Sequence, residues 1–212
     1  MTRRAVGLVL MLAATAVLTA QQRDPEQYAR MLESRERVEH MQVDRVVAAL
    51  QLKPGQTVAD LGSGSGLFTR PLARAVAPGG TAYAVDIDPK LLEIVQRSAG
   101  EAGLTNIRTV HATPDDPTLP GPVDLIFICD AYHHLPDKPA YAKTLARYVK
   151  PGGRVAVIDF AAHWPSGHEA MQYTVQDLDG WMTAAGFTRQ QSFDFPEDSF
   201  FVIYNEPVNR EP

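Results

Sequence analysis

Cysteine is nearly absent from this chain of 212 residues, in which Cys129 is the only one. A single cysteine excludes an internal disulfide and a cysteine-based zinc site. Clusters of basic residues are lacking too, since 20 lysines and arginines face 25 acidic residues and the arginines between Arg23 and Arg45 alternate with acids, as on a solvated helix face. No segment would neutralise a row of phosphates, so nucleic acid is not an expected partner.

Internal repeats and low-complexity segments are missing as well, and 15 glycines with 16 prolines are near average usage. With 45% hydrophobic and 21% charged residues the chain can bury a full core, which excludes a mainly disordered or collagen-like protein. Its length is typical of one domain, or of one domain with an appendage.

The N-terminus holds the longest apolar run, because residues 5–20 carry no charge and follow Arg3 and Arg4 directly. This order is typical of a secretory signal peptide over residues 1–20, with cleavage expected after Ala20. An uncleaved membrane anchor and a wrongly assigned start codon are the alternatives. Both a cleaved signal peptide and an uncleaved anchor would send the rest of the chain out of the cytoplasm, as a periplasmic or secreted protein. Only the uncleaved segment would bind a membrane. Loss of the two arginines would change the net charge from −5 to −7.

Periodicity divides the remainder into an N-terminal helical segment at 21–52 and a larger domain at 53–212. A helix is predicted over 24–50, either as a lid over the cofactor with Tyr28 and Met31 facing inward or packed against the edge of the sheet. Further along, short β-rich runs alternate with helical stretches, which indicates parallel strands joined by right-handed crossovers with helices on both faces. Strands are expected at 57–61, 81–86, 107–111, 123–129, 154–159, 186–194 and 200–204, the last two as an antiparallel hairpin, and helices at 67–76, 89–102, 138–149 and 176–185.

A glycine-rich turn follows the first predicted strand and reads Asp60-Leu61-Gly62-Ser63-Gly64-Ser65-Gly66. A strand that passes through such a turn into a helix lets backbone N–H groups approach a ligand closely. A dinucleotide site expects glycine where Leu67 stands, and the Asp60 carboxylate would repel a pyrophosphate, which disfavours a nicotinamide-dependent dehydrogenase. Asp86 ends the second strand, where a ribose diol is held. Together these residues describe a nucleoside with a cationic tail.

Five motifs in this order resemble the class I S-adenosylmethionine-dependent methyltransferases over about residues 35–205. They are the turn at 60–66, the acid Asp86, the segment 123–135, Lys150-Pro151-Gly152-Gly153-Arg154 and Ala184-Ala185-Gly186-Phe187. The resemblance implies an α/β fold with a Rossmann-like, doubly wound sheet of seven strands in the order 3-2-1-4-5-7-6, the last strand antiparallel, preceded by N-terminal helices. It also implies S-adenosyl-L-methionine as cofactor and a small-molecule or lipid-like acceptor.

The same resemblance assigns individual residues to the cofactor. The turn at 62–66 would cradle the methionine part, Asp60 would lie near its ammonium, Asp86 would bind the ribose hydroxyls and Ile87 would pack on the adenine. The acid that many relatives carry after the third strand is missing, so Asp115 or a backbone carbonyl is expected to bind the adenine amino group. The implied cofactor-binding residues are Asp60, Gly62, Ser63, Gly64, Gly66, Asp86, Ile87, Asp115 and Asp130.

The acceptor side is expected after the fourth and fifth strands, because ligands bind at the strand ends of open α/β sheets. Methyl transfer is an in-line displacement, so the protein mainly aligns the acceptor and excludes water. A base is needed only where the acceptor first loses a proton, and Asp130, His133 and His134 are the candidate catalytic residues. Local packing of His134 and a capping role for Asp130 are the alternatives. The loop 163–168 is a candidate for acceptor recognition.

Two other functions stay open. Asp130 and Asp159 end neighbouring strands, as the metal ligands of Mg-dependent catechol-type O-methyltransferases do, but Phe160 replaces the amide that follows the second acid there. The sequence therefore predicts no metal ligand. The export signal conflicts with a cofactor made inside cells, which leaves an exported, non-catalytic nucleoside-binding protein as the other alternative, although the intact glycine turn argues against it. The acceptor atom and the oligomeric state are left undetermined.

Overall fold

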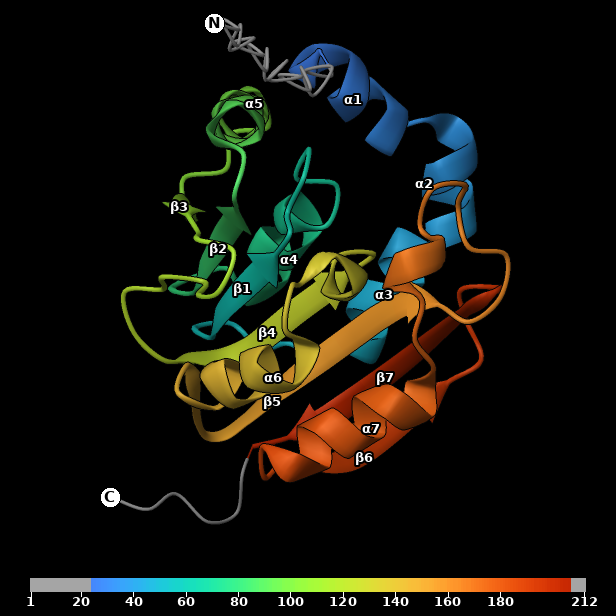
Figure 1. The fold of residues 1–212 in the computed structure, drawn as a ribbon. Coiled ribbons are helices and arrows are strands. Elements are labelled where there is room, and N and C mark those ends of the chain that lie inside the picture. Colours follow the sequence, from blue (N-terminus) through green and yellow to red (C-terminus); the bar gives the residue numbers. More distant parts are fainter. Residues whose placement is uncertain (1–23, 207–212) are drawn as a thin grey trace, which may run out of the picture.

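The computed structural model describes residues 24–206, which form a seven-stranded sheet between two layers of helices (Figure 1). The strand order is β3-β2-β1-β4-β5-β7-β6, and β7 runs antiparallel to both of its neighbours, as predicted. The predicted leader at 1–20 lies outside the described residues, and no helix within 24–206 is long and apolar enough to span a bilayer. The strands are β1 (Thr57–Leu61), β2 (Thr81–Asp86), β3 (Ile107–His111), β4 (Val123–Cys129), β5 (Val149–Phe160), β6 (Thr188–Phe193) and β7 (Ser199–Asn205).

The helices cover both faces of the sheet. One face carries α3, α4 and α5, and the other carries α6 and α7 (Figure 1). The central strand β4 is buried on both sides because its alternate side chains enter the two cores: Leu125 and Phe127 pack with the first group of helices, and Ile126 and Ile128 with the second. The bounds are α3 (Val43–Ala49), α4 (Thr69–Val76), α5 (Pro89–Glu101), α6 (Lys138–Ala146) and α7 (Val175–Ala184).

The N-terminal segment differs from the single helix predicted over 24–50. It forms three helices, α1 (Pro25–Leu32), α2 (Arg35–Met41) and α3, because the chain turns twice. The Ser34 hydroxyl accepts a hydrogen bond from the backbone N–H of Arg37 and so starts α2 as a new helix. Gln42 adopts a left-handed conformation with φ of +47°, which no continuous helix contains. Apolar periodicity alone does not report such breaks.

The carboxyl ends of β1, β2, β4 and β5 lie along one edge of the sheet. The parallel registers place Leu61 beside both Val85 and Ile128, and Cys129 beside Ile158. The turns that follow these residues therefore meet at one place, where α1 and α2 also arrive. This edge is where the sequence analysis expects both the cofactor and the acceptor.

Candidate functional site

The glycine turn after β1 is closed to side chains. Gly62 and Gly64 have φ of +75° and +51°, conformations that favour glycine. A Cβ added to Gly62 would lie 2.4 Å from the Cβ of Ala131, and one added to Gly64 would lie 2.8 Å from Cδ1 of Leu32. The backbone of this turn is thus held against the segment after β4 and against α1.

Asp86 joins the glycine turn to the end of β2. Its Oδ2 accepts a hydrogen bond of 2.8 Å from the backbone N–H of Gly64, and its Oδ1 accepts one of 2.9 Å from Asp88. Burial raises the pKa of the Asp86 carboxyl, while these backbone donors oppose the shift. Ile87 follows and is 61% exposed, the highest value among the large apolar residues of the described chain. A polar acceptor beside an exposed apolar side chain suits a ribose joined to a base.

Asp60 supplies the buried carboxyl at the start of the glycine turn. It is 3% exposed, and its Oδ2 accepts a 2.5 Å hydrogen bond from the Thr69 hydroxyl at the start of α4. Burial raises its pKa to about 7; the bond from Thr69 acts in the opposite direction, and the nearby Asp86 carboxyl adds to the rise. A nearby cation stabilises a buried carboxylate of this kind. The ammonium group of the methionine part, which the sequence analysis places near Asp60, would be such a cation.

Asp130 is paired with a residue that the sequence analysis did not assign to the site. Its Oδ2 accepts a 2.7 Å hydrogen bond from Nη2 of Arg37 in α2. The alternation of arginines with acids placed Arg37 on a solvated helix face, and this expectation is wrong, because only 27% of its side chain is exposed. Burial raises the pKa of Asp130, while Arg37 opposes the shift. No signal in the sequence links two residues so far apart.

Several buried polar atoms around the turn have no hydrogen-bond partner in the described part of the chain. They are Oγ of Ser63 and Ser65, Oδ1 of Asp130 and Nε of Arg37. Leaving such groups unpaired costs about 1–3 kcal/mol each, so a polar ligand that satisfies them is favoured. With the tight backbone of Gly62 and Gly64 and the acids Asp60 and Asp86, these atoms fit the predicted cofactor. Gly66, with φ of +82°, completes the turn.

Two predicted contacts, that of Asp115 with the adenine and that of the lid residues, differ in how they appear in the structure. Asp115 lies exposed in the turn after β3, which is closed by a bond from Thr113 N–H to the Asp116 carbonyl, and no hydrogen bond ties Asp115 to β2 within residues 24–206. In α1 the expectation for Met31 is wrong, since that side chain is 55% exposed. Leu32 faces Gly64 instead, and Tyr28 packs on α5.

Ion pairs hold the N-terminal helices over this edge. Glu33 pairs with Arg70 of α4 at 2.8 Å, and Glu26 pairs with Arg97 of α5 at 2.7 Å.

A groove of about 540 Å³ opens between α2, α3 and the start of α4. None of the predicted site residues lines this groove, so the cofactor is not placed there.

The acceptor side is organised around Asp159, the penultimate residue of β5. Its Oδ1 accepts hydrogen bonds from Nδ1 of His133 at 2.8 Å and from the N–H of Phe160 at 3.0 Å. Its Oδ2 accepts from the N–H of His133 at 3.1 Å and from the Tyr173 hydroxyl at 2.8 Å. Four donors thus surround this buried carboxylate, while Oδ2 of the neighbouring Asp130 is paired with Arg37.

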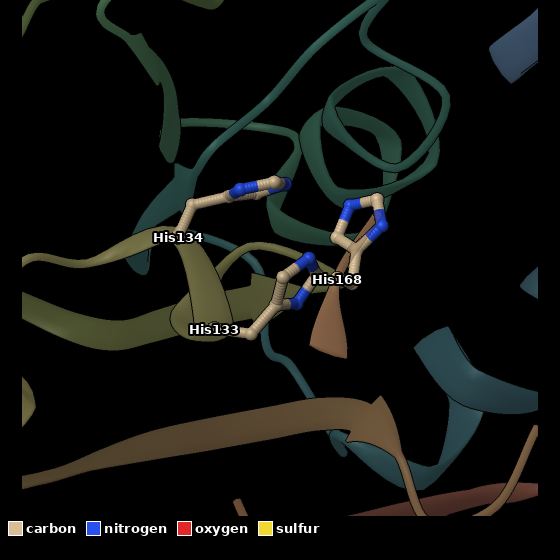
Figure 2. A group of neighbouring side chains, drawn as sticks. All are labelled: His133, His134 and His168. Atoms are coloured by element: carbon tan, nitrogen blue, oxygen red, sulfur yellow. The ribbon is translucent and has the colours of Figure 1, made fainter. Parts of the chain in front are cut away.

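His133 and His134 lie side by side in a short 3-10 helix, η1 (Tyr132–His134), that follows β4. His133 is 2% exposed, and His134 is exposed in part. Partial desolvation, and then the neighbouring rings of His133 and His168, lower the pKa of His134 to about 4, so its ring is neutral at pH 7. His168 comes from the predicted acceptor loop after β5, and the sequence analysis did not group it with the other two (Figure 2).

Comparison with known proteins identifies relatives of this chain. Residues 58–153 match the family described as "Methyltransferase domain". The Nocamycin O-methyltransferase of Saccharothrix syringae is 31% identical over 114 residues, which make up 53% of this chain and 41% of that protein. The Ubiquinone/menaquinone biosynthesis C-methyltransferase of Vibrio vulnificus is 31% identical over 111 residues, 51% of this chain and 43% of that protein.

This chain thus spans about two fifths of the length of these curated relatives. Among solved structures, a SAM dependent methyltransferase from Aquifex aeolicus matches over 86% of this chain and 98% of that chain, with a TM-score of 0.76 and 24% sequence identity. The likeness to this structure concerns the fold, which is the one implied by the sequence motifs.

Proposed function

Because residues 58–153 match the methyltransferase-domain family, we propose that this chain is a class I S-adenosylmethionine-dependent methyltransferase, which transfers the methyl group of S-adenosylmethionine to a small-molecule or lipid-like acceptor held beyond β4 and β5. One observation carries the proposal: the carboxyls of Asp60 and Asp86 flank a glycine turn that is closed to side chains and bordered by buried, unpaired polar atoms. When bound, the cofactor supplies an electrophilic methyl group on a cationic sulfonium.

The residues of the chain bind, orient and exclude water. The turn at 62–66 holds the methionine part, Asp60 offsets its ammonium charge, and Asp86 accepts hydrogen bonds from the ribose while Ile87 covers the base. Leu32 of α1 and Arg37 of α2 close the site from above, which keeps water from the reacting atoms.

His133 is oriented to accept a proton from the acceptor. An ionised Asp159 accepts hydrogen bonds only, so Nδ1 of His133 carries the proton and Nε2 presents a lone pair away from β5. The ring centroid of His134 lies 4.0 Å from that of His133, and Asp130 follows β4 directly. The names of the two curated relatives refer to oxygen and carbon acceptors, which supports a small-molecule acceptor and leaves the acceptor atom open.

Calorimetry on the full chain with S-adenosylhomocysteine tests the cofactor site. Asp86→Asn should weaken binding by roughly 30-fold, because hydrogen bonds to a charged group contribute about 2 kcal/mol. Glu93→Gln, an exposed carboxylate on α5, is the control and should bind normally. Absence of binding to wild type at millimolar concentration would refute the proposal, and equal affinity of Asp86→Asn would show that the site lies elsewhere.

Binding alone does not separate an enzyme from the non-catalytic alternative. Release of S-adenosylhomocysteine in the presence of phenols, hydroquinones and carboxylic acids is the second readout, and the enzyme proposal requires turnover with at least one of these classes. Binding without any turnover would favour the exported nucleoside-binding protein.

We also propose that the chain is exported, on the basis of the charged start and apolar run at 1–20. N-terminal sequencing of the protein isolated from periplasmic and cytosolic fractions is the direct test. A protein that retains Met1 and is found in the cytosol would overturn the proposal.

A further inference from the structure

Three histidine rings converge at the acceptor side of the sheet (Figure 2). His133 and His134 come from η1 after β4, and His168 comes from the loop after β5, directly before the 3-10 helix η2 (Glu169–Met171). One nitrogen of each ring lies within 4.8 Å of the other two. The ring centroids of His133 and His168 are 5.2 Å apart, and those of His134 and His168 are 5.4 Å apart. Two separate segments thus bring three ligand atoms to one point.

The buried carboxylate of Asp159 fixes the orientation of His133, the most buried of the three histidines. Asp159 binds Nδ1 of His133 and is itself held by the Tyr173 hydroxyl, so the lone pair of Nε2 is directed away from the sheet. Nε2 of His133 and Nδ1 of His168 are buried and have no hydrogen-bond partner among residues 24–206. A carboxylate behind a histidine is the arrangement that orients metal-bound histidines in proteins.

Two aromatic side chains border the histidine cluster. The rings of Phe160 and Trp164 lie 5.5 and 5.6 Å from that of His133 and exclude water from one side. Unpaired imidazole nitrogens in such surroundings are costly, and a bound ion would satisfy them together.

We propose that His133, His134 and His168 bind one divalent transition-metal ion, with Zn²⁺ as the probe. Nitrogens that bind zinc at 2.0–2.1 Å in a tetrahedron lie about 3.3 Å apart, so separations of up to 4.8 Å require the rings to close by about 1.5 Å. His168 can supply this movement, because it stands in the loop that joins β5 to η2. The sequence predicted no metal because it weighed only Asp130 and Asp159 as ligands.

Three histidine ligands leave a fourth coordination position open, as in catalytic zinc sites. At this position the ion would bind an oxygen of the acceptor, and this role of the ion depends on the methyltransferase function proposed above. The metal site itself does not depend on that function, since it follows from the three rings and Asp159 alone.

Metal binding is measured on the untagged full chain after treatment with a chelator. Titration with Zn²⁺ against a chromophoric chelator should give one ion per chain with a micromolar or tighter dissociation constant, and Co²⁺ should produce the visible absorption of a four-coordinate ion. Azide should change this absorption if the fourth position is open. An unchanged spectrum would overturn the open position.

Variants locate the ion. His134→Ala and His168→Ala should each weaken binding at least 100-fold, and Asp159→Asn should weaken it by roughly 10- to 100-fold as a positioning residue. His163→Ala is the matched control, since His163 stands exposed in the same loop and pairs with Asp198. Each variant is checked by its melting curve and by its affinity for S-adenosylhomocysteine.

Two results would overturn the proposal. They are the absence of bound metal in excess Zn²⁺, and equal affinity of wild type and His168→Ala. In both cases binding of S-adenosylhomocysteine can remain intact, and His133 with Asp159 would then act as a metal-free base. Failure of the metal site is therefore distinguishable from failure of the proposed function.

Discussion

Asp60→Asn is expected to stabilise the free protein at pH 8 and to weaken its hold on the cofactor. In wild type the carboxyl is 3% exposed and its pKa is raised from 3.8 to about 7, chiefly by burial. Asparagine keeps an oxygen that can accept the hydrogen bond from Thr69 but carries no charge. The variant therefore removes the cost of a buried charge while leaving the local geometry in place.

The magnitude follows from the two pKa values. Between pH 3.8 and 7 the folded protein holds a proton on Asp60 that the unfolded chain has lost, so the wild-type free energy of unfolding falls as the pH rises. The slope is about 1.4 kcal/mol per pH unit, and it ends near pH 7, where the folded carboxyl also ionises. From pH 5 to pH 8 the advantage of Asp60→Asn over wild type should grow by about 3 kcal/mol.

Urea denaturation of both proteins at pH 5 and pH 8 measures this growth, and comparing the two pH values cancels any effect of the substitution that does not depend on charge. A difference that changes by less than about 1 kcal/mol would refute the reasoning. The second readout is affinity for S-adenosylhomocysteine, which should fall in the variant at pH 8. Higher stability with unchanged affinity would show that Asp60 is buried but does not face the ligand's ammonium.

Two further substitutions test the contacts that shape the site. Gly62→Ala should lower the free energy of unfolding by about 2–3 kcal/mol, because the new Cβ would meet the Cβ of Ala131, whereas Gly103→Ala, with φ of +66° but open space around it, should cost about 1 kcal/mol; similar costs in urea denaturation would contradict the contact. Arg37→Met should cost about 3 kcal/mol by leaving the Asp130 carboxylate buried and unpaired, and adding Asp130→Asn should recover most of it. A double-mutant cycle measures this coupling, and simple additivity would argue against the ion pair.

Local patterns were sufficient for most of the fold. The strand β4 is read correctly because six of its seven residues are apolar and can be buried on both faces, and the terminal hairpin because its two strands lie close in sequence. Errors occur where the local signal is weak. The helix predicted over 24–50 breaks at Ser34 and Gln42, and β5 begins at Val149, ahead of the predicted residue 154, because the segment before it continues the extended chain.

For the proposed cofactor site the sequence was informative about position. The turn at 62–66 and Asp86 each follow or end one strand, and parallel pairing brings such strand ends together. The acceptor side was only partly readable. His133 and His134 were named as candidates, but their relation to His168 depends on how the loop after β5 folds back over η1.

By itself, the sequence determined the alternation of strands and helices, the glycine turn and the acids at the strand ends, because these depend on residues adjacent along the chain. Only the tertiary structure decided that Arg37 reaches Asp130, that Leu32 covers Gly64 and that three histidines share one point. Side chains from segments far apart meet through the packing of whole helices and loops, and no period within a single segment encodes that packing.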